Sequence, residues 1–276
     1  ANVMAVMVQY QSAKLGVVTG KTLPQTLGER LSRRGRLLFW GQAELVAGAT
    51  DIAEVIGGAI ALNLLFGLPL PVGGLIVGVV SIVLLALANP GRQRQFERVI
   101  VGLLAVIVIG FLAGLFVSPP DAAGIVHGMM PRLEGTETVL LAASMLGATV
   151  MPHAIYLHSS LVIDRHGKPK GESRIRGLLS ATRVDVAVAL VIAGTVNIAL
   201  LVLAASSLYG REGTDTIEGA HAAVQDALGP VVAGAFAVGL LASGIASTSV
   251  GSYAGGVIMT GLIRKQIPML VRRSVT

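Results

Sequence analysis

Residues 138–162 read TVLLAASMLGATVMPHAIYLHSSLV, an apolar run of membrane-spanning length with a proline near its middle. Pro152 has no amide hydrogen and crowds the carbonyl of Ala148, so we expect the helix to kink or unwind there. In lipid an unpaired carbonyl is costly, and it is tolerated only against protein or a polar cavity. Met151 and His153 flank the proline with a thioether and an imidazole. The stretch therefore indicates an ion site, the alternative being a packing kink with a core methionine and a hydrogen-bonded histidine.

The composition of the chain is that of a membrane protein. Its 276 residues are 53% hydrophobic and 13% charged, with a mean hydropathy of +0.77. The net charge of +6 would suit nucleic acid, but only 4% of residues are aromatic and no basic stripe is interleaved with them, so we expect no nucleic-acid partner. Because the chain contains no cysteine, any metal ligand must be oxygen, imidazole or thioether.

Seven apolar stretches, and the beginning of an eighth, approach the ~20 residues that cross a bilayer. Nineteen of the 21 basic residues fall in alternate connections, as expected when those connections are cytoplasmic. We expect the chain to be an excerpt of a longer protein, with at least one span upstream. The pattern predicts an all-α, polytopic transmembrane helix bundle and a single transmembrane domain over residues 1–276, with spans at about 1–18, 37–65, 72–88, 99–117, 138–162, 184–205 and 231–263 and the next starting at 267.

The second stretch carries three carboxylates, Glu44, Asp51 and Glu54. Their spacing places them on one stripe of a helix, because Asp51 and Glu54 are i and i+3 and Glu44 is two turns earlier. Ionisable residues inside membrane spans are rare and usually functional, so this ladder is a candidate proton pathway. The alternative is ion pairing with arginine or lysine from another helix.

Two further polar residues lie within the predicted spans. His158 follows Met151 by seven residues, and its favoured interpretation is a buried, hydrogen-bonded polar residue. Gln9 either links two helices or contacts a site, with the helix link favoured. The histidines at positions 127, 166 and 221 are expected in loops, without a special role.

The thioether of Met151 bears on the choice of metal. Sulfur favours softer transition metals, whereas Ca²⁺ and Mg²⁺ prefer oxygen ligands. If Met151 is a ligand, Mn²⁺, Fe²⁺, Co²⁺ and Cd²⁺ should be preferred over the alkaline earths. Since no acidic residue lies near Met151 in the sequence, we expect an aspartate or asparagine from a partner helix upstream of the chain.

Residues 147–159, GATVMPHAIYLHS, closely resemble the signature of the sixth helix of Nramp (natural resistance-associated macrophage protein) divalent-metal transporters. Three more stretches resemble the second, third and eighth helices of that family, namely residues 11–16, 51–57 and 247–255. The resemblance covers nearly the whole chain and looks like a bacterial member. It implies a LeuT-like inverted-repeat transporter fold, of which this chain would lack the first helix and the C-terminal helices.

The resemblance also implies roles for individual residues. The metal would be bound by the backbone carbonyl of Ala148 and the thioether of Met151, with Pro152 supporting the break. The first-helix Asp-Pro-Gly-Asn motif of the family is absent, so this chain would hold about half of the site and the missing first helix would be its partner. Positions tied to proton movement match Asp51, Glu54 and His153, with Arg272 or Arg273 as counter-charge and with Glu44, His158 and Gln9 as supporting members of the polar network.

The expected function is proton-coupled import of Mn²⁺ or Fe²⁺ by alternating access, as a multi-pass protein of the bacterial inner membrane. Metal ions and protons would be transported, and no permanently bound cofactor is expected. One alternative is a sodium-coupled organic-solute symporter of the same fold, which the sulfur at the break disfavours. Another is a non-transporting membrane scaffold fragment. An intramembrane hydrolase would need a motif such as His-Glu-x-x-His or Gly-x-Ser-x-Gly; neither occurs, so we do not expect an enzyme.

Overall fold

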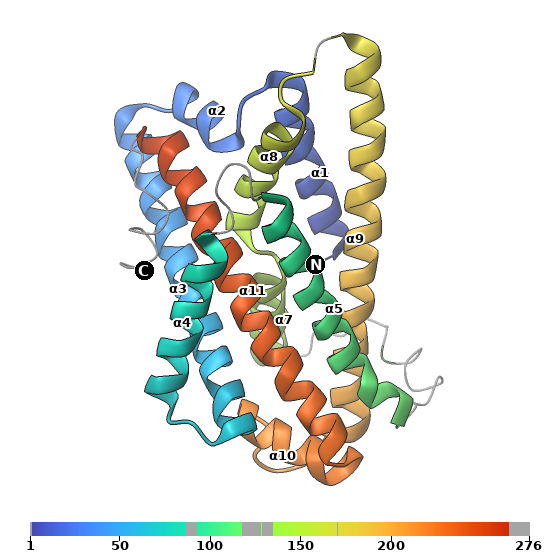
Figure 1. Cartoon of the computed structure of the whole chain (residues 1–276). Helices are drawn as coiled ribbons and strands as arrows, with labels where there is room; N and C mark the ends of the chain where they lie inside the picture. The colour runs from blue at the N-terminus through green and yellow to red at the C-terminus, as the bar shows by residue number, and fades with distance from the viewer. Residues whose placement is uncertain (1, 87–92, 118–127, 129–134, 170, 265–276) are drawn as a thin grey trace. The chain divides into compact units, whose positions relative to one another are not determined.

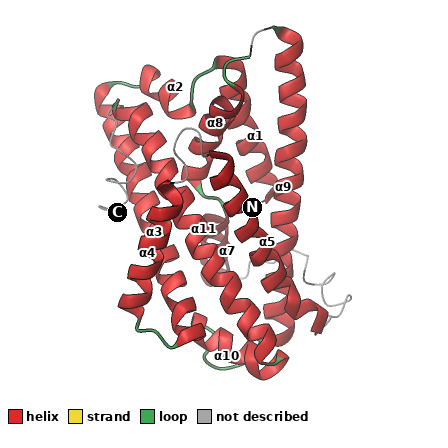
Figure 2. Ribbon diagram, in the orientation of Figure 1, coloured by secondary structure: helices red, strands yellow, loops and turns green. Residues whose placement is uncertain are grey.

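The computed structural model describes residues 2–86, 93–117, 128, 135–169 and 171–264, and the regular structure of these residues is entirely helical (Figures 1 and 2). The predicted all-α class is thereby confirmed. The helices, in chain order, are α1 (Asn2–Thr19), α2 (Leu23–Arg30), α3 (Arg33–Phe66), α4 (Leu70–Ala86), α5 (Gln93–Val117), α7 (Gly135–Thr149), α8 (Pro152–His166), α9 (Glu172–Ser207), α10 (Ile217–Leu228) and α11 (Pro230–Ile263).

Several of these helices are long and apolar enough to cross a membrane. Within the described ranges, length and composition select α3, the α7–α8 pair, α9 and α11, with α4 as a shorter apolar helix. Helices α1 and α5 overlap the remaining predicted spans, 1–18 and 99–117. The predicted span starting at 267 lies outside the described residues.

Helix α9 is longer than predicted. It begins at Glu172 rather than near Val184 and contains 36 residues. At 1.5 Å per residue it is about 54 Å long, well beyond the ~30 Å of a hydrocarbon core. The first turns of α9 therefore extend past its apolar part, which starts at Val184, and carry polar and basic side chains instead.

Two short helices were not predicted, because their apolar content is too low for a span. Helix α2 is started by a capping box in which Thr22 and Gln25 bind each other's backbone N–H. Helix α10 is started by Thr216, whose hydroxyl accepts from the N–H of Gly219. The prediction of a loop around His221 is wrong, since this residue lies in α10, and His166 is the last residue of α8.

The chain divides into two compact units. The first comprises Ala1–Asp51, Glu134–Ala193 and Val250–Thr276, and the second comprises Ile52–Leu133 and Gly194–Ser249. Helices α3, α9 and α11 each contribute residues to both units.

In the first unit, α8 lies directly against α1 (Figure 1). The approach is close because Gly16 has no side chain: a Cβ there would stand 2.7 Å from the carbonyl oxygen of Ser159. The hydroxyl of Ser12 donates to the carbonyl of Ile155, and the hydroxyl of Ser159 accepts from the N–H of Leu23 at 2.9 Å. Helix α8 is thereby fixed to α1 and to the start of α2.

In the second unit, glycines again allow close helix contacts. A Cβ on Gly244 of α11 would lie 2.8 Å from the carbonyl oxygen of Glu54 on α3, and one on Gly58 would lie 2.8 Å from Val77 on α4. The Gly- and Ser-rich segment at 243–252 was predicted to be a close-packed helix interface, and the Gly244 contact shows such packing.

Candidate functional site

The helix over residues 138–162 is interrupted where Pro152 predicts a break. Helix α7 ends at Thr149, and α8 begins at Pro152. Met151 between them is extended, with φ −83° and ψ 102°. The N–H of Val150 still donates to the carbonyl of Leu146 at 3.0 Å. The helical donor for the carbonyl of Ala148 would be Pro152, which has no N–H, so the break leaves this carbonyl without its usual partner.

The two helix ends at the break have opposite polarity. The last carbonyl groups of α7 carry partial negative charge, and the first N–H groups of α8 carry partial positive charge. Met151 makes no side-chain cap at the start of α8. Ala148 is exposed and Met151 is half-buried. The α7 end of the break therefore carries partial negative charge beside the Ala148 carbonyl and the Met151 thioether.

His153 is the buried polar group of this region, with only 2% of its surface exposed. Both of its ring nitrogens are buried without a hydrogen-bond partner among the described residues. The carboxylate of Asp51, on α3 and 8% exposed, interacts electrostatically with the imidazole. The backbone of α11 passes the ring at Gly251. The fold thus brings together His153 and Asp51, two residues that are far apart in the sequence.

Glu44 and Glu54, the other members of the predicted carboxylate ladder, fall in different units of the chain. Glu44 and Asp51 lie on the part of α3 that belongs to the first unit, and Glu54 lies on the part that belongs to the second. The proposed counter-charges Arg272 and Arg273 lie outside the described residues.

His158 and Gln9 form a contact between α8 and α1. The Nδ1 of His158 and the side-chain oxygen of Gln9 are 2.7 Å apart. The imidazole also interacts electrostatically with Asp185 on α9. The contact links two helices, as was favoured for Gln9, and it gives the half-buried His158 a hydrogen-bonding partner. Asp185 was not singled out from the sequence, although an acidic residue inside the predicted 184–205 span was a usable signal.

A second polar link was also missed by the sequence reasoning. The carboxylate of Asp164, near the end of α8, accepts hydrogen bonds of 3.2 Å from the hydroxyls of Ser160 and Tyr253. Tyr253 is on α11, so this carboxylate ties α8 to α11 within the first unit. The i, i+4 spacing of Ser160 and Asp164 was visible in the sequence, but the partner on α11 was not.

Over the described ranges, no three side chains of histidine, cysteine, aspartate or glutamate come together as a metal site. The break itself offers two other donor groups from this chain, the backbone carbonyl of Ala148 and the sulfur of Met151.

A membrane helix that is broken near its middle is typical of the transporter folds that are built with discontinuous helices. The family model described as "Natural resistance-associated macrophage protein-like" matches residues 1–276. The chain belongs to this family, Nramp.

Similar sequences and a similar solved structure support the family and the fold. The divalent metal cation transporter MntH of Mycobacterium tuberculosis (strain H37Rv) is 58% identical over all 276 residues, and that of Erwinia tasmaniensis is 42% identical over 279 aligned positions. A crystal structure of the Eremococcus coleocola manganese transporter matches 99% of the chain, with a TM-score of 0.88 and 32% identity. This identifies the LeuT-like fold. The chain spans 64% of the M. tuberculosis protein and 60% of the E. coleocola chain.

Proposed function

We propose that this protein is a transporter, not an enzyme, and that it imports divalent transition-metal ions, Mn²⁺ and Fe²⁺, by alternating access. The observation that carries the proposal is the break between α7 and α8, which presents the Ala148 carbonyl and the Met151 thioether at the polar end of a helix. The names of the relatives, which are divalent metal cation and manganese transporters, agree with this choice of substrate.

The ligand types support a transition metal over an alkaline earth. A thioether is a soft ligand that Mn²⁺, Fe²⁺, Co²⁺ and Cd²⁺ accept more readily than Ca²⁺ or Mg²⁺. A complete site also needs an anionic ligand, because transfer of a divalent ion out of water must be compensated by charge. We assign that ligand to the first helix of the whole protein, which carries the Asp-Pro-Gly-Asn motif in this family.

We further propose that import is coupled to protons, with Asp51 and His153 as the groups that accept them. The pair supports this because the buried imidazole of His153 and the buried carboxylate of Asp51 interact electrostatically. Two buried titratable groups that sense each other can take up and release a proton when the occupancy of an adjacent site changes. Glu54, Glu44 and one of Arg272 and Arg273 would continue the path along α3.

The proposed location is the inner membrane of a bacterium. The long apolar helices fit a bilayer, and the basic connections fit a cytoplasmic side. In this orientation α8, the second half of the broken helix, runs toward the cytoplasm.

The test is uptake by the full-length protein in liposomes. We expect Mn²⁺ entry, measured with an enclosed fluorescent chelator, to exceed that of empty liposomes and to rise with an inward proton gradient. Labelled amino acids with a sodium gradient form the comparison, since a sodium-coupled solute symporter of the same fold would carry them instead. Amino-acid uptake without Mn²⁺ uptake would refute the proposal, and so would the absence of both in correctly folded protein.

A further inference from the structure

Within the first unit, α8 and α1 pack as one pair of helices. Gly16 of α1 lies directly against the carbonyl of Ser159 on α8, and the hydroxyl of Ser12 donates to the carbonyl of Ile155. The two contacts lie one turn apart on both helices. Because both involve the backbone of α8, this helix cannot shift along α1 without losing them.

Helix α2 and the end of α11 pack as a second pair. A Cβ on Gly28 of α2 would overlap the carbonyl oxygen of Gly261 on α11, and a Cβ on Gly261 would stand 2.7 Å from the backbone nitrogen of Gln25. Backbone therefore meets backbone at these two glycines. Such an interface adjusts little, so α2 is held on α11 as firmly as α8 is held on α1.

Two residues of α8 connect the first pair to the second through hydrogen bonds. The hydroxyl of Ser159 accepts from the N–H of Leu23, at the start of α2, at 2.9 Å. The carboxylate of Asp164 accepts from the hydroxyl of Tyr253, on α11, at 3.2 Å. Asp164 is exposed, so water can replace Tyr253 as its partner. Unlike the backbone packing within each pair, these contacts can open and close at small cost.

The chain between the two pairs allows such a movement. Residues 20–22 connect α1 to α2, and Gly20 has a φ of 65°. Glycine adopts this left-handed conformation without strain and can leave it as easily. The angle between α1 and α2 can therefore change within the connection, while both helices stay intact.

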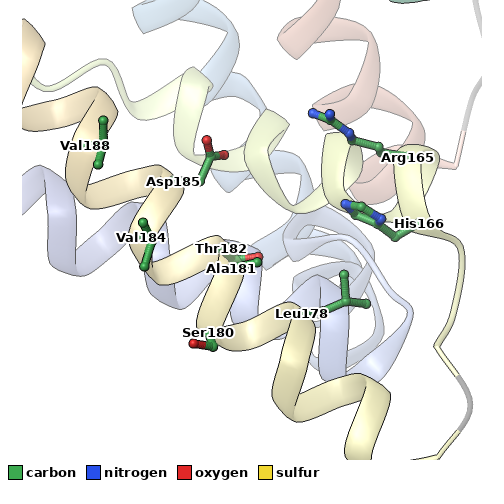
Figure 3. Close-up of a pocket in the computed structure, with 9 residues that line it drawn as sticks. All are labelled: Arg165, His166, Leu178, Ser180, Ala181, Thr182, Val184, Asp185 and Val188. Carbon is green, nitrogen blue, oxygen red and sulfur yellow. The ribbon is translucent and has the colours of Figure 1, made fainter.

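Helix α8 also has open space on its other side. Arg165 and His166, which follow Asp164, line a cleft of about 670 Å³ together with residues of α9 (Figure 3). The first part of α9 and the end of α11 lie on either side of α8 (Figure 1). A movement of α8 away from α11 is therefore directed toward a cleft, not toward a packed interface.

We propose that Ser159 and Asp164 form a cytoplasmic latch, which holds α8 against α2 and α11 and opens when α1 and α8 move away as a pair. The inference rests on the proposed alternating access, and it names the contacts that close the cytoplasmic side. Basic residues gather in the connections on either side of the latch, at 21–36 and 165–176, as expected for this side of the membrane.

The test measures the distance between α8 and α2 by double electron–electron resonance on the full-length protein in lipid nanodiscs. Spin labels are attached at His166→Cys on α8 and Arg30→Cys on α2, two exposed positions. Residues 1–276 contain no cysteine, and any elsewhere is replaced by serine. Tyr253→Phe and Ser159→Ala each remove one hydrogen bond of the latch. Each should raise the ratio of the long-distance to the short-distance population about fivefold, and the double variant should raise it further.

Tyr209→Phe and Ser173→Ala are the matched controls, because they make the same chemical changes at exposed positions outside the latch. They should change the ratio by less than about twofold. An unchanged ratio in either latch variant would overturn the proposal, and so would equal changes in the controls.

The Mn²⁺ uptake assay is read separately from these distances. A raised ratio in the latch variants of a protein that takes up no Mn²⁺ would refute the proposed function and leave the latch in place. Mn²⁺ uptake together with unchanged ratios would refute the latch alone.

Discussion

The Nε2 atom of His153 on α8 lies 3.6 Å from the position that a Cβ would take on Gly251 of α11. The imidazole is thus held in place by a helix face that has no side chain at this point. A single methyl group fits at 3.6 Å, which is an ordinary van der Waals distance, but a branched side chain does not. Gly251 therefore sets the space available to the buried histidine beside the break.

Substitutions of Gly251 should show whether the space at this glycine is needed for the position of His153. Gly251→Ala should leave Mn²⁺ uptake within about twofold, whereas Gly251→Val should lower it about tenfold, because overpacking costs about 1–3 kcal/mol. Gly234→Val is the matched control on α11, since a Cβ at Gly234 meets nothing within 4 Å. Equal uptake by the two valine variants in proteoliposomes would show that His153 does not depend on this contact.

The packing of α1 on α8 gives a prediction about stability. Gly16→Ala would place a Cβ 2.7 Å from the carbonyl oxygen of Ser159, and a backbone atom cannot move aside cheaply. We expect a loss of about 1–3 kcal/mol in the free energy of unfolding, seen as a lower melting temperature in detergent. Gly41→Ala on α3, where a Cβ meets nothing within 4 Å, should instead raise stability by up to about 1 kcal/mol. A stabilised Gly16→Ala variant would contradict the close contact.

The His158 and Gln9 contact can be tested by a double-mutant cycle. The 2.7 Å separation indicates a hydrogen bond, so the two alanine substitutions should be non-additive by about 1 kcal/mol in the free energy of unfolding. Gln11, exposed on the same helix, serves as the control, and its alanine variant should be additive with His158→Ala. A coupling energy near zero between Gln9 and His158 would show that this hydrogen bond does not stabilise the protein.

The proton pathway makes a separate prediction. Asp51→Asn removes the charge that faces His153 but keeps the size of the side chain. Proton entry that accompanies Mn²⁺ uptake should fall about tenfold or more, while Mn²⁺ binding by calorimetry persists. Asp226→Asn, at an exposed position of α10, should alter neither quantity. Normal proton entry in the Asp51 variant would exclude this residue from the mechanism.

The helix break and the helix content could be predicted from the sequence because their causes are local. A proline without an N–H disrupts a helix wherever it lies, and apolar runs of bilayer length mark helices without knowledge of their neighbours. The close packing at Gly244 could also be predicted, because this glycine lies in a segment rich in small residues. Residues 147–159 also indicated the family, and the match of the family model to residues 1–276 confirms it.

The tertiary partners could not be predicted in this way. The electrostatic interaction of His153 with Asp51 and the hydrogen bond of Tyr253 to Asp164 join helices that are far apart in the sequence, and no sequence spacing encodes them. Helices α2 and α10 were missed because capping residues, not hydrophobicity, define their starts. The early start of α9 was missed for a related reason, since polar residues of good helix propensity extend an apolar helix without an apolar signal.

The central claim is that Met151, at the break between α7 and α8, selects transition metals. The most direct measurement compares Mn²⁺ and Ca²⁺ uptake by the full-length protein and its Met151→Ala variant in liposomes, with Met145→Ala on the exposed face of α7 as control. We predict that Met151→Ala lowers Mn²⁺ uptake only several-fold, because oxygen ligands remain, and admits Ca²⁺ at a rate about tenfold or more above that of the control. Unchanged exclusion of Ca²⁺ by the Met151→Ala variant would contradict the claim.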